Sequence, residues 1–268
     1  MDPVAEKQAA VWASIDELCS SLEPSEWDLS TECPGWTVKD QLSHLLAPEI
    51  GLLGHPQPDH HAPEAAHVKN PVGALNEDAV DYRRSRPGDE ILDEFRRVTG
   101  ERVRVLSAMS EADLAADSWT PVGPGSVRDL LTIRVFDAWT HEQDMRRATN
   151  RPGSLEGSLA EHSRDRCLLA MPFVVGKKAK APEGSVVVFD ITGPSGKAVA
   201  IGVEGGRAKA LDTLPRDSTC VLRMDVEAFT RLSCGRWDPT AAISRGQVQV
   251  EGDHDLARRV VEEINFMF

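Results

Sequence analysis

Residues 126–149 read SVRDLLTIRVFDAWTHEQDMRRAT, and this stretch decides how the first half of the chain folds. Ser126, followed three residues later by Asp129, is a capping box, a side-chain arrangement that starts a helix. Apolar residues then recur at helical spacing, so we predict one amphipathic helix to the end of the stretch. Asp137 and His141 lie four residues apart on this helix and therefore project from the same face.

The same capping pattern occurs earlier in the chain. Thr37, with an acidic residue three positions later, predicts a second helix that continues until Pro48 bends or ends it. His44 lies seven residues after this cap, whereas Asp137 and His141 lie eleven and fifteen residues after theirs. These spacings differ by about one helical turn, so the three side chains converge if the two helices pack side by side.

Two imidazoles and one carboxylate form a ligand set for zinc or another divalent metal, with coordination positions left open. An open position gives a Lewis acid that can bind and deprotonate water or a thiol. Spacing alone leaves a second interpretation open. In it, His44 and His141 are hydrogen-bonded core residues, and the four-residue spacing of Asp137 and His141 arises by chance. Asp144, three residues after His141, is a candidate partner for that imidazole ring.

Two further regions complete a predicted four-helix bundle. Asp2 and Pro3 start the first helix, and residues 76–110 form a third helical region that is interrupted at 86–89. Residues 51–75 are expected to form a loop. The interpretation that we favour for the loop histidines is solvated surface, with metal binding as the alternative, and they are His55, His60, His61 and His67. The tryptophans expected in the core or lining a pocket are Trp36, Trp119 and Trp139.

The pattern changes in the second half of the chain. After a helical stretch at 154–171, the predicted strands are 186–191, 199–203, 208–211, 220–224 and 247–251. Helices are predicted at 225–234 and 253–268. A turn-forming cluster at 150–153 separates the two patterns. We therefore predict an α+β protein of two domains, a four-helix bundle over residues 1–152 and a small α+β domain over residues 153–268.

Composition and charge exclude several classes of protein. The chain has 268 residues, of which 41% are apolar and 27% charged, which is typical of a soluble globular protein. Its net charge is −13, and the whole excess of acidic residues lies in residues 1–150. Such a chain lacks the overall positive charge that favours binding to nucleic acid or to an anionic membrane. The longest apolar run, residues 167–176, has ten residues and contains a proline, so no membrane span is expected.

Targeting and cysteine patterns point to the cytoplasm. The N-terminal sequence MDPVAEKQ has no apolar signal core. The five cysteines are widely spaced and include no CxxC pair, which excludes a zinc ribbon or a thioredoxin-type site and favours reduced thiols.

Three stretches resemble the mycothiol-dependent maleylpyruvate isomerase family, part of the DinB-like superfamily. They are CPGWTVKDQLSHL at 33–45, RVFDAWTHEQDMRRA at 134–148, and the C-terminal stretch from GDHDLAR at 252–258 to NFMF at 265–268. The resemblance implies a DinB-type bundle that binds a divalent metal, usually zinc, through His44, Asp137 and His141. It also implies a C-terminal domain similar to sterol-carrier proteins. The isomerase itself has glutamate at the position of Asp137, one methylene longer.

The function expected from the residues and the resemblance together is that of an enzyme. It would be a divalent-metal-dependent, mycothiol-using isomerase or thiol S-transferase that acts on a small electrophilic substrate through a metal-bound thiolate. The alternatives are a non-catalytic protein that binds metal and a small ligand, and a hydrolase that uses metal-activated water. The expected partners are the small substrate and the low-molecular-weight thiol, without nucleic acid or membrane, and the chain is expected to be a monomer or homodimer. No other catalytic or substrate-binding residue is assigned.

Overall fold

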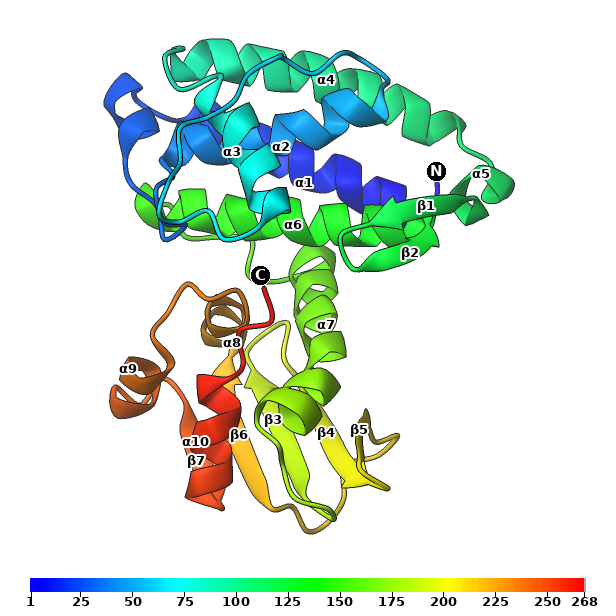
Figure 1. Ribbon diagram of the computed structural model, residues 1–268, viewed down its shortest axis with the longest axis vertical. Coiled ribbons are helices and arrows are strands. Elements are labelled where there is room, and N and C mark those ends of the chain that lie inside the picture. The colour runs from blue at the N-terminus through cyan, green and yellow to red at the C-terminus, as the bar shows by residue number, and fades with distance from the viewer. Residues whose placement is uncertain (268) are drawn as a thin grey trace. The chain divides into compact units, whose positions relative to one another are not determined.

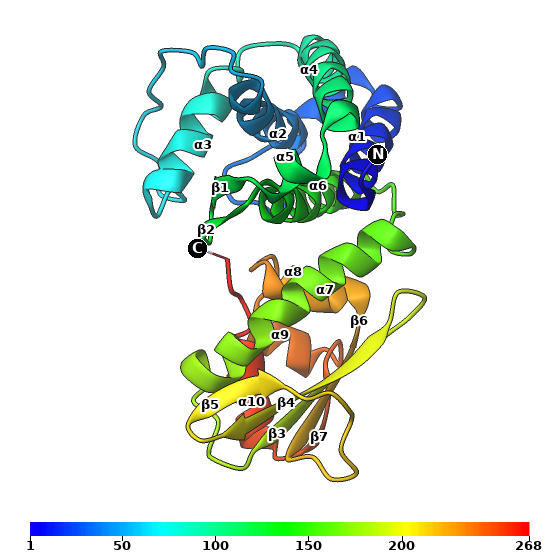
Figure 2. The same ribbon diagram turned by 90° about the vertical axis from the view of Figure 1, so that its right-hand side faces the viewer.

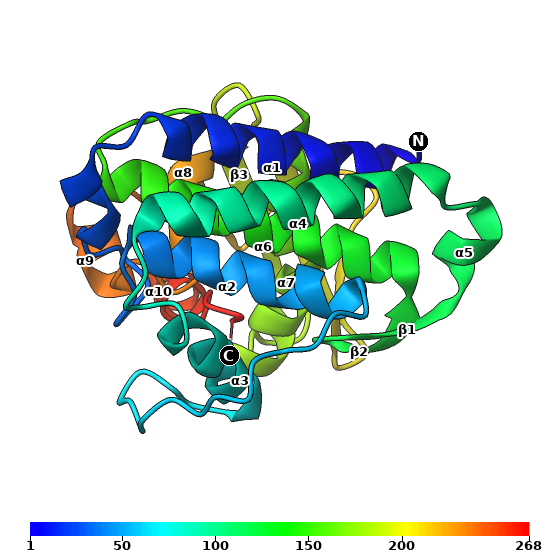
Figure 3. The same ribbon diagram turned by 90° about the horizontal axis from the view of Figure 1, so that it is seen from above.

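The first structural unit, residues 1–153, contains four long helices that pack as a bundle (Figure 1). The computed structural model describes residues 1–267. The bundle helices are α1 (Pro3–Ser20), α2 (Val38–Leu52), α4 (Gly88–Ala108) and α6 (Val127–Ala148). Helices α1 and α2 each contact both α4 and α6, which closes the bundle (Figure 3). The predicted four-helix bundle is therefore confirmed.

Two capping boxes fix where α2 and α6 begin, as the sequence predicts. The N–H of Thr37 donates to Asp40 Oδ2 at 2.9 Å, and the N–H of Ser126 donates to Asp129 Oδ2 at 2.8 Å. These bonds satisfy backbone donors that a helix start leaves without partners. They also set the rotation of each helix, and hence which side chains face the neighbouring helix.

Two boundaries differ from the prediction. Helix α2 continues through Pro48, because proline removes only one backbone donor and the buried Ile50 holds the next turn against the bundle. The loop before the third helical region is shorter than expected, since α3 (Pro71–Asp81) begins where the Asn70 side chain accepts the N–H of Gly73 at 2.9 Å. Helix α3 packs against α2 and lies outside the four-helix core.

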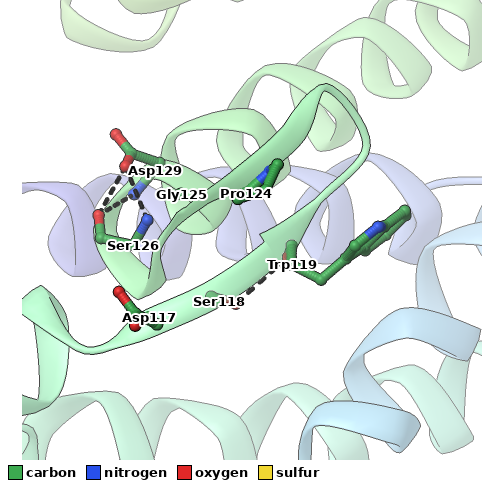
Figure 4. Close-up of a pocket in the computed structure, with 7 residues that line it drawn as sticks. All are labelled: Asp117, Ser118, Trp119, Pro124, Gly125, Ser126 and Asp129. Atoms are coloured by element: carbon green, nitrogen blue, oxygen red, sulfur yellow. Dashed lines mark hydrogen bonds between the residues drawn. The ribbon is translucent and has the colours of Figure 1, made fainter.

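The short elements of the first unit are not predicted by the sequence. They are η1 (Pro24–Asp28), α5 (Glu111–Ala115), β1 (Asp117–Thr120) and β2 (Gly123–Ser126). Strands β1 and β2 form an antiparallel hairpin that leads into α6. Trp119 lies on this hairpin and is 66% exposed, so of the two predicted positions, core or pocket lining, the core is excluded. It helps to line a shallow surface pocket, where its ring points away from Ser126 and Asp129 (Figure 4).

The second unit begins at Ser154 and contains a five-stranded sheet with strand order β5-β4-β3-β6-β7 (Figure 2). The strands are β3 (Val186–Thr192), β4 (Lys197–Glu204), β5 (Arg207–Ala210), β6 (Cys220–Asp225) and β7 (Gln249–Gly252). Strand β3 runs parallel to β6, and the other neighbours are antiparallel. All five strands lie close to their predicted positions, which confirms the α+β class.

Helices cover the sheet of the second unit. They are α7 (Ser158–Phe173), the π-helical turn η2 (Val174–Lys178), α8 (Val226–Ser233), α9 (Pro239–Ser244) and α10 (His254–Glu262). Burial alternates along β3 and β6, so Phe189 and Leu222 face the core that Phe229 of α8 completes. The last helix ends at Glu262, earlier than predicted, and the final residue of that prediction, Phe268, lies outside the described residues. Helix α9 was not predicted.

Two further observations concern the chain as described. None of the five cysteines forms a disulfide, and Cys19 and Cys167 are buried as expected for core residues. Among residues 1–267, the helices are too short or too polar for any of them to cross a bilayer.

Candidate metal centre

His44, Asp137 and His141 meet inside the helix bundle. His44 lies on α2 and the other two on α6, and these two helices are in contact. One ligand atom from each residue lies within 4.8 Å of the others, and this is the one such group found among residues 1–267. The structure thus brings together the three side chains that helical spacing placed on facing surfaces.

The distances in this cluster suit a small divalent ion. His44 Nε2 lies 3.4 Å from Asp137 Oδ2, and His141 Nε2 lies 3.5 Å from Asp137 Oδ1. Two ligand atoms of a tetrahedral zinc ion, each about 2.0–2.1 Å from the metal, are about 3.3 Å apart. The donor set therefore fits an ion of this kind, and each histidine nitrogen lies at about this spacing from one of the two Asp137 oxygens.

Burial and neighbouring charges perturb all three groups. Burial lowers the pKa of His44, although the carboxylate of Asp137 acts in the opposite direction. Burial also opposes the charged form of His141, but hydrogen bonds with Asp137 and Asp144 outweigh it and raise the pKa of that imidazole. For Asp137, burial is outweighed by the positive charges of His44 and Arg134, which hold the pKa of the carboxyl well below its usual range.

The ring of His141 is oriented by two polar neighbours. Its Nδ1 contacts Gln41 Oε1 and lies 3.6 Å from Asp144 Oδ2, as the sequence suggested for Asp144. Gln41 is itself held by a 2.6 Å hydrogen bond from its Nε2 to Thr31 Oγ1. Sequence analysis missed Gln41, although its place three residues before His44 was a usable signal. These contacts leave Nε2 of His141 facing the centre, which is how outer partners orient metal-ligating histidines.

Trp36 forms an aromatic wall beside both histidines. Its ring centroid lies 5.0 Å from that of His44 and 5.9 Å from that of His141. Its indole N–H donates to Glu77 Oε2 at 2.8 Å, which ties the ring to α3. Because His44 Nδ1 is buried and has no hydrogen-bond partner among residues 1–267, packing against Trp36 contributes to holding that imidazole.

A buried ionic network also reaches the cluster through Asp137. Arg134 Nη1 donates to Asp137 Oδ2 at 2.6 Å, and Arg134 Nε donates to Glu49 Oε1 at 3.0 Å. The second oxygen of Glu49 accepts a 2.8 Å hydrogen bond from Arg102 Nε on α4. Sequence analysis missed this network, because only its position three residues before Asp137 marks Arg134 in the sequence.

The loop histidines do not form a second cluster. Each one pairs with a carboxylate of α3 or its end, or of α4, and the pairs are His55–Glu101, His60–Asp81, His61–Asp78 and His67–Glu77. The expected solvated surface holds for His61, whose side chain is 89% exposed, whereas His67 is largely covered. These pairs fasten residues 53–70 to the neighbouring helices, which the composition of the loop did not indicate.

The fold and the cluster define a two-unit protein whose helix bundle encloses a His-Asp-His group. Residues 8–146 match the family model for the mycothiol maleylpyruvate isomerase N-terminal domain, and residues 161–259 match the model for the C-terminal domain of the same family. The chain therefore belongs to the mycothiol maleylpyruvate isomerase family, which confirms the resemblance seen in its motifs.

Solved structures share the fold of this chain, and two curated sequences are similar to it over most of its length. Two crystal structures of mycothiol-dependent maleylpyruvate isomerase, one of a point mutant, superpose with TM-scores of 0.59 and 0.58. Both are 15% identical to this chain and cover 93% of it and 93% of their own length, which shows a shared fold. Two uncharacterized proteins of Mycobacterium tuberculosis, from strains CDC 1551 and H37Rv, are each 27% identical over 191 residues. That match covers 68% of this chain and 70% of each relative.

Sterol carrier protein 2 also matches the second unit, over 38% of this chain, but with a TM-score of 0.29. That score is too low to establish a shared fold, so the sterol-carrier likeness of the C-terminal domain stays a prediction.

Proposed function

We propose that this protein is a divalent-metal-dependent enzyme that uses mycothiol to isomerise a small electrophilic substrate or to form a thiol conjugate with it. The observation that carries the proposal is the convergence of His44, Asp137 and His141 within the N-terminal domain of this family. In this proposal, residues 1–152 form the metal-binding domain and residues 153–268 a separate α+β domain. Zinc is the ion proposed, because two imidazoles and a carboxylate suit it.

The three side chains would supply Nε2 of each histidine and an oxygen of Asp137 to the ion. A divalent metal bound there would supply Lewis acidity, which holds the sulfur of a thiol as thiolate near neutral pH. With neutral imidazoles, Asp137 is the one formal negative charge in the ligand set, so the site keeps a net attraction for an anionic sulfur.

The surrounding residues have roles that follow from their contacts. Gln41 and Asp144 hold the ring of His141 so that Nε2 faces the centre. Trp36 presents an aromatic surface that excludes water from one side, which strengthens the electrostatic interactions within the cluster. The Asp137 side chain is 20% exposed whereas both histidines are buried, which supports access to the cluster at this residue.

The thiols of the chain support a reducing location. None of the five cysteines forms a disulfide, and four of them are buried, so none requires an oxidising compartment. We therefore keep the cytoplasm as the proposed location.

The test is thiol-dependent turnover, with mycothiol as the thiol and maleylpyruvate as the first substrate. The wild type should turn over only when thiol is present, and His141→Ala should lose that activity because a ligand is removed. His61→Ala is the matched control, since that histidine lies in the same unit with its side chain 89% exposed. Equal rates in wild type and His141→Ala, or turnover that does not need thiol, would contradict the proposal.

A further inference from the structure

Arg134 forms hydrogen bonds through all three of its guanidinium nitrogens beside the candidate metal centre. It is buried on α6, and three of its nitrogens donate hydrogen bonds. Nη1 bonds Asp137 Oδ2 at 2.6 Å, Nε bonds Glu49 Oε1 at 3.0 Å, and Nη2 bonds the carbonyl oxygen of Leu45 at 3.4 Å. The planar guanidinium therefore spans from α6 to two residues of α2, a geometry that a lysine ammonium cannot reproduce.

Glu49 keeps Arg134 in this position. Its carboxylate is 1% exposed and is shared between two arginines, Arg134 of α6 and Arg102 of α4. Moving Arg134 away would leave Glu49 with one partner and a buried charge less well compensated, which is costly in a low-dielectric interior. The guanidinium is consequently a fixed part of the cluster and is not a mobile surface side chain.

The two oxygens of Asp137 therefore have different surroundings. Oδ2 accepts the short hydrogen bond from Arg134 and lies 3.4 Å from His44 Nε2, whereas Oδ1 lies 3.5 Å from His141 Nε2. Arg134, Asp137 and His141 follow one another at three- and four-residue spacing, which aligns them along one face of α6. We propose that Arg134 is a positioning residue that restricts Asp137 to a single metal-binding oxygen, Oδ1. This inference rests on the proposed function of the cluster as a metal site.

The restriction has a chemical consequence for the site. A carboxylate can bind an ion through one oxygen or through both, and the second oxygen would occupy a position that a catalytic site keeps open. With Oδ2 held by Arg134, the protein would supply one ligand atom from each of His44, Asp137 and His141. The remaining coordination position would then be available to the sulfur of a thiol. Arg134 would also fix the position of the aspartate carboxylate, whose side chain is one methylene shorter than that of glutamate.

Cobalt(II) is a suitable probe, because its visible absorption weakens as coordination rises from four towards six. The purified full chain would be loaded with Co²⁺ as wild type, Arg134→Gln, Arg134→Lys and the control Arg128→Gln. Arg128 lies on the same helix and pairs with Asp2 and Glu111, away from the cluster. We expect Arg134→Gln to lose visible absorption as Asp137 binds through both oxygens, and to bind metal about 10–100-fold more weakly, as is typical when a partner that orients a ligand is removed.

Arg134→Lys keeps the charge but cannot bond Glu49 and Asp137 together, so we expect a spectrum between those of wild type and Arg134→Gln. Arg128→Gln should match the wild type. If Arg134→Gln does not fold, Arg134→Lys is compared with wild type in its place. A wild-type spectrum and wild-type affinity in the folded Arg134 variants would overturn the assignment of Arg134 while leaving the metal site intact. A wild type that binds no Co²⁺ would instead contradict the metal site, and this inference with it.

Discussion

The two units of this protein differ in what they bury. The described part of the second unit, residues 154–267, has an apolar core in which Arg164 is the one buried charged residue. The first unit buries His44 and His141 together with many charged side chains, among them Asp40, Glu49, Glu77, Arg83, Arg102, Arg134, Glu142 and Asp144. Both units contain enough apolar residues for a core, so hydrophobic burial alone does not explain this contrast.

Buried charge is a costly way to stabilise a fold. A well-packed apolar group is often as stabilising as a buried ion pair, whereas an ion pair deprived of one partner is strongly destabilising. Three of these charges reach the His-Asp-His cluster: Arg134 bonds Asp137, Glu49 bonds Arg134, and Asp144 lies 3.6 Å from His141 Nδ1. The comparison therefore indicates that the first unit buries charged side chains that position a site, whereas the second unit is stabilised mainly by apolar packing.

The largest predicted effect on stability comes from breaking this network at its centre. Glu49→Ala leaves Arg102 and Arg134 buried without their shared anion, so we expect a loss of about 3–5 kcal/mol in the free energy of unfolding. Urea unfolding followed by tryptophan fluorescence measures this, because five of the six tryptophans lie in the first unit. Glu90→Ala, at an exposed position of α4, is the control and should stay near wild type. A Glu49→Ala variant as stable as this control would remove the contrast between the units.

Acid should weaken the first unit before the second. Burial opposes the charge of Glu77, but hydrogen bonds from His67, Trp36 and Arg84 outweigh it and hold the pKa of this carboxyl below its usual value of 4.5. A depressed folded-state pKa gives stability that is present above the ordinary pKa and is lost as pH falls through the folded value. The bonds to the charged carboxylate are worth about 1.5–3 kcal/mol.

Urea titrations between pH 7 and pH 3, followed by tryptophan fluorescence, test this expectation. Glu77→Gln should be less stable than wild type at pH 7 and should lose less stability on acidification, since its amide does not titrate. Parallel acid profiles for the two proteins would show that the hydrogen-bonded carboxylate contributes no pH-dependent stability.

The smallest effect is expected at a surface ion pair of the second unit. Arg223 Nε donates to Asp190 Oδ2 at 2.7 Å between β6 and β3, but the Arg223 side chain is 42% exposed. Solvent screening limits such pairs to about 0.2–1 kcal/mol, so Asp190→Asn should change stability by no more than that. Hydrogen exchange of the β3 and β6 amides, measured by mass spectrometry, reports this locally. A loss comparable to that of Glu49→Ala would mean that surface charge matters as much here as buried charge does in the bundle.

Most of the fold was predictable because its signals are local. Capping boxes placed the starts of α2 and α6, and short runs of strand-forming residues marked the strands of the sheet. The errors arose where packing overrides local preference, as at Pro48 inside α2, or where an element is short and rich in glycine and proline, as in β2. The last helix was predicted to be longer because Ile264 continues the helical spacing of apolar residues, although the helix ends at Glu262.

The site was predictable in part for a related reason. His44, Asp137 and His141 share helical spacing from a recognisable cap, so their meeting follows from two helices in contact. Gln41 and Glu49 lie on α2 with His44, and Gln41 alone has a helical spacing that relates it to the cluster. The contacts of Glu49 with Arg134 of α6 and Arg102 of α4 join different helices, and no spacing in the sequence shows them. Pairing between distant helices is a property of the packed bundle, and a single sequence does not display it.

Metal content is the most direct test of the central claim that the bundle encloses a metal site. Elemental analysis of the purified wild type should give about one equivalent of zinc or a similar divalent ion per chain, as expected for a site with three protein ligands. His44→Ala and Asp137→Ala should each lose that ion, and His61→Ala should retain it. A folded wild type that holds no metal and takes up none when it is added would contradict the account.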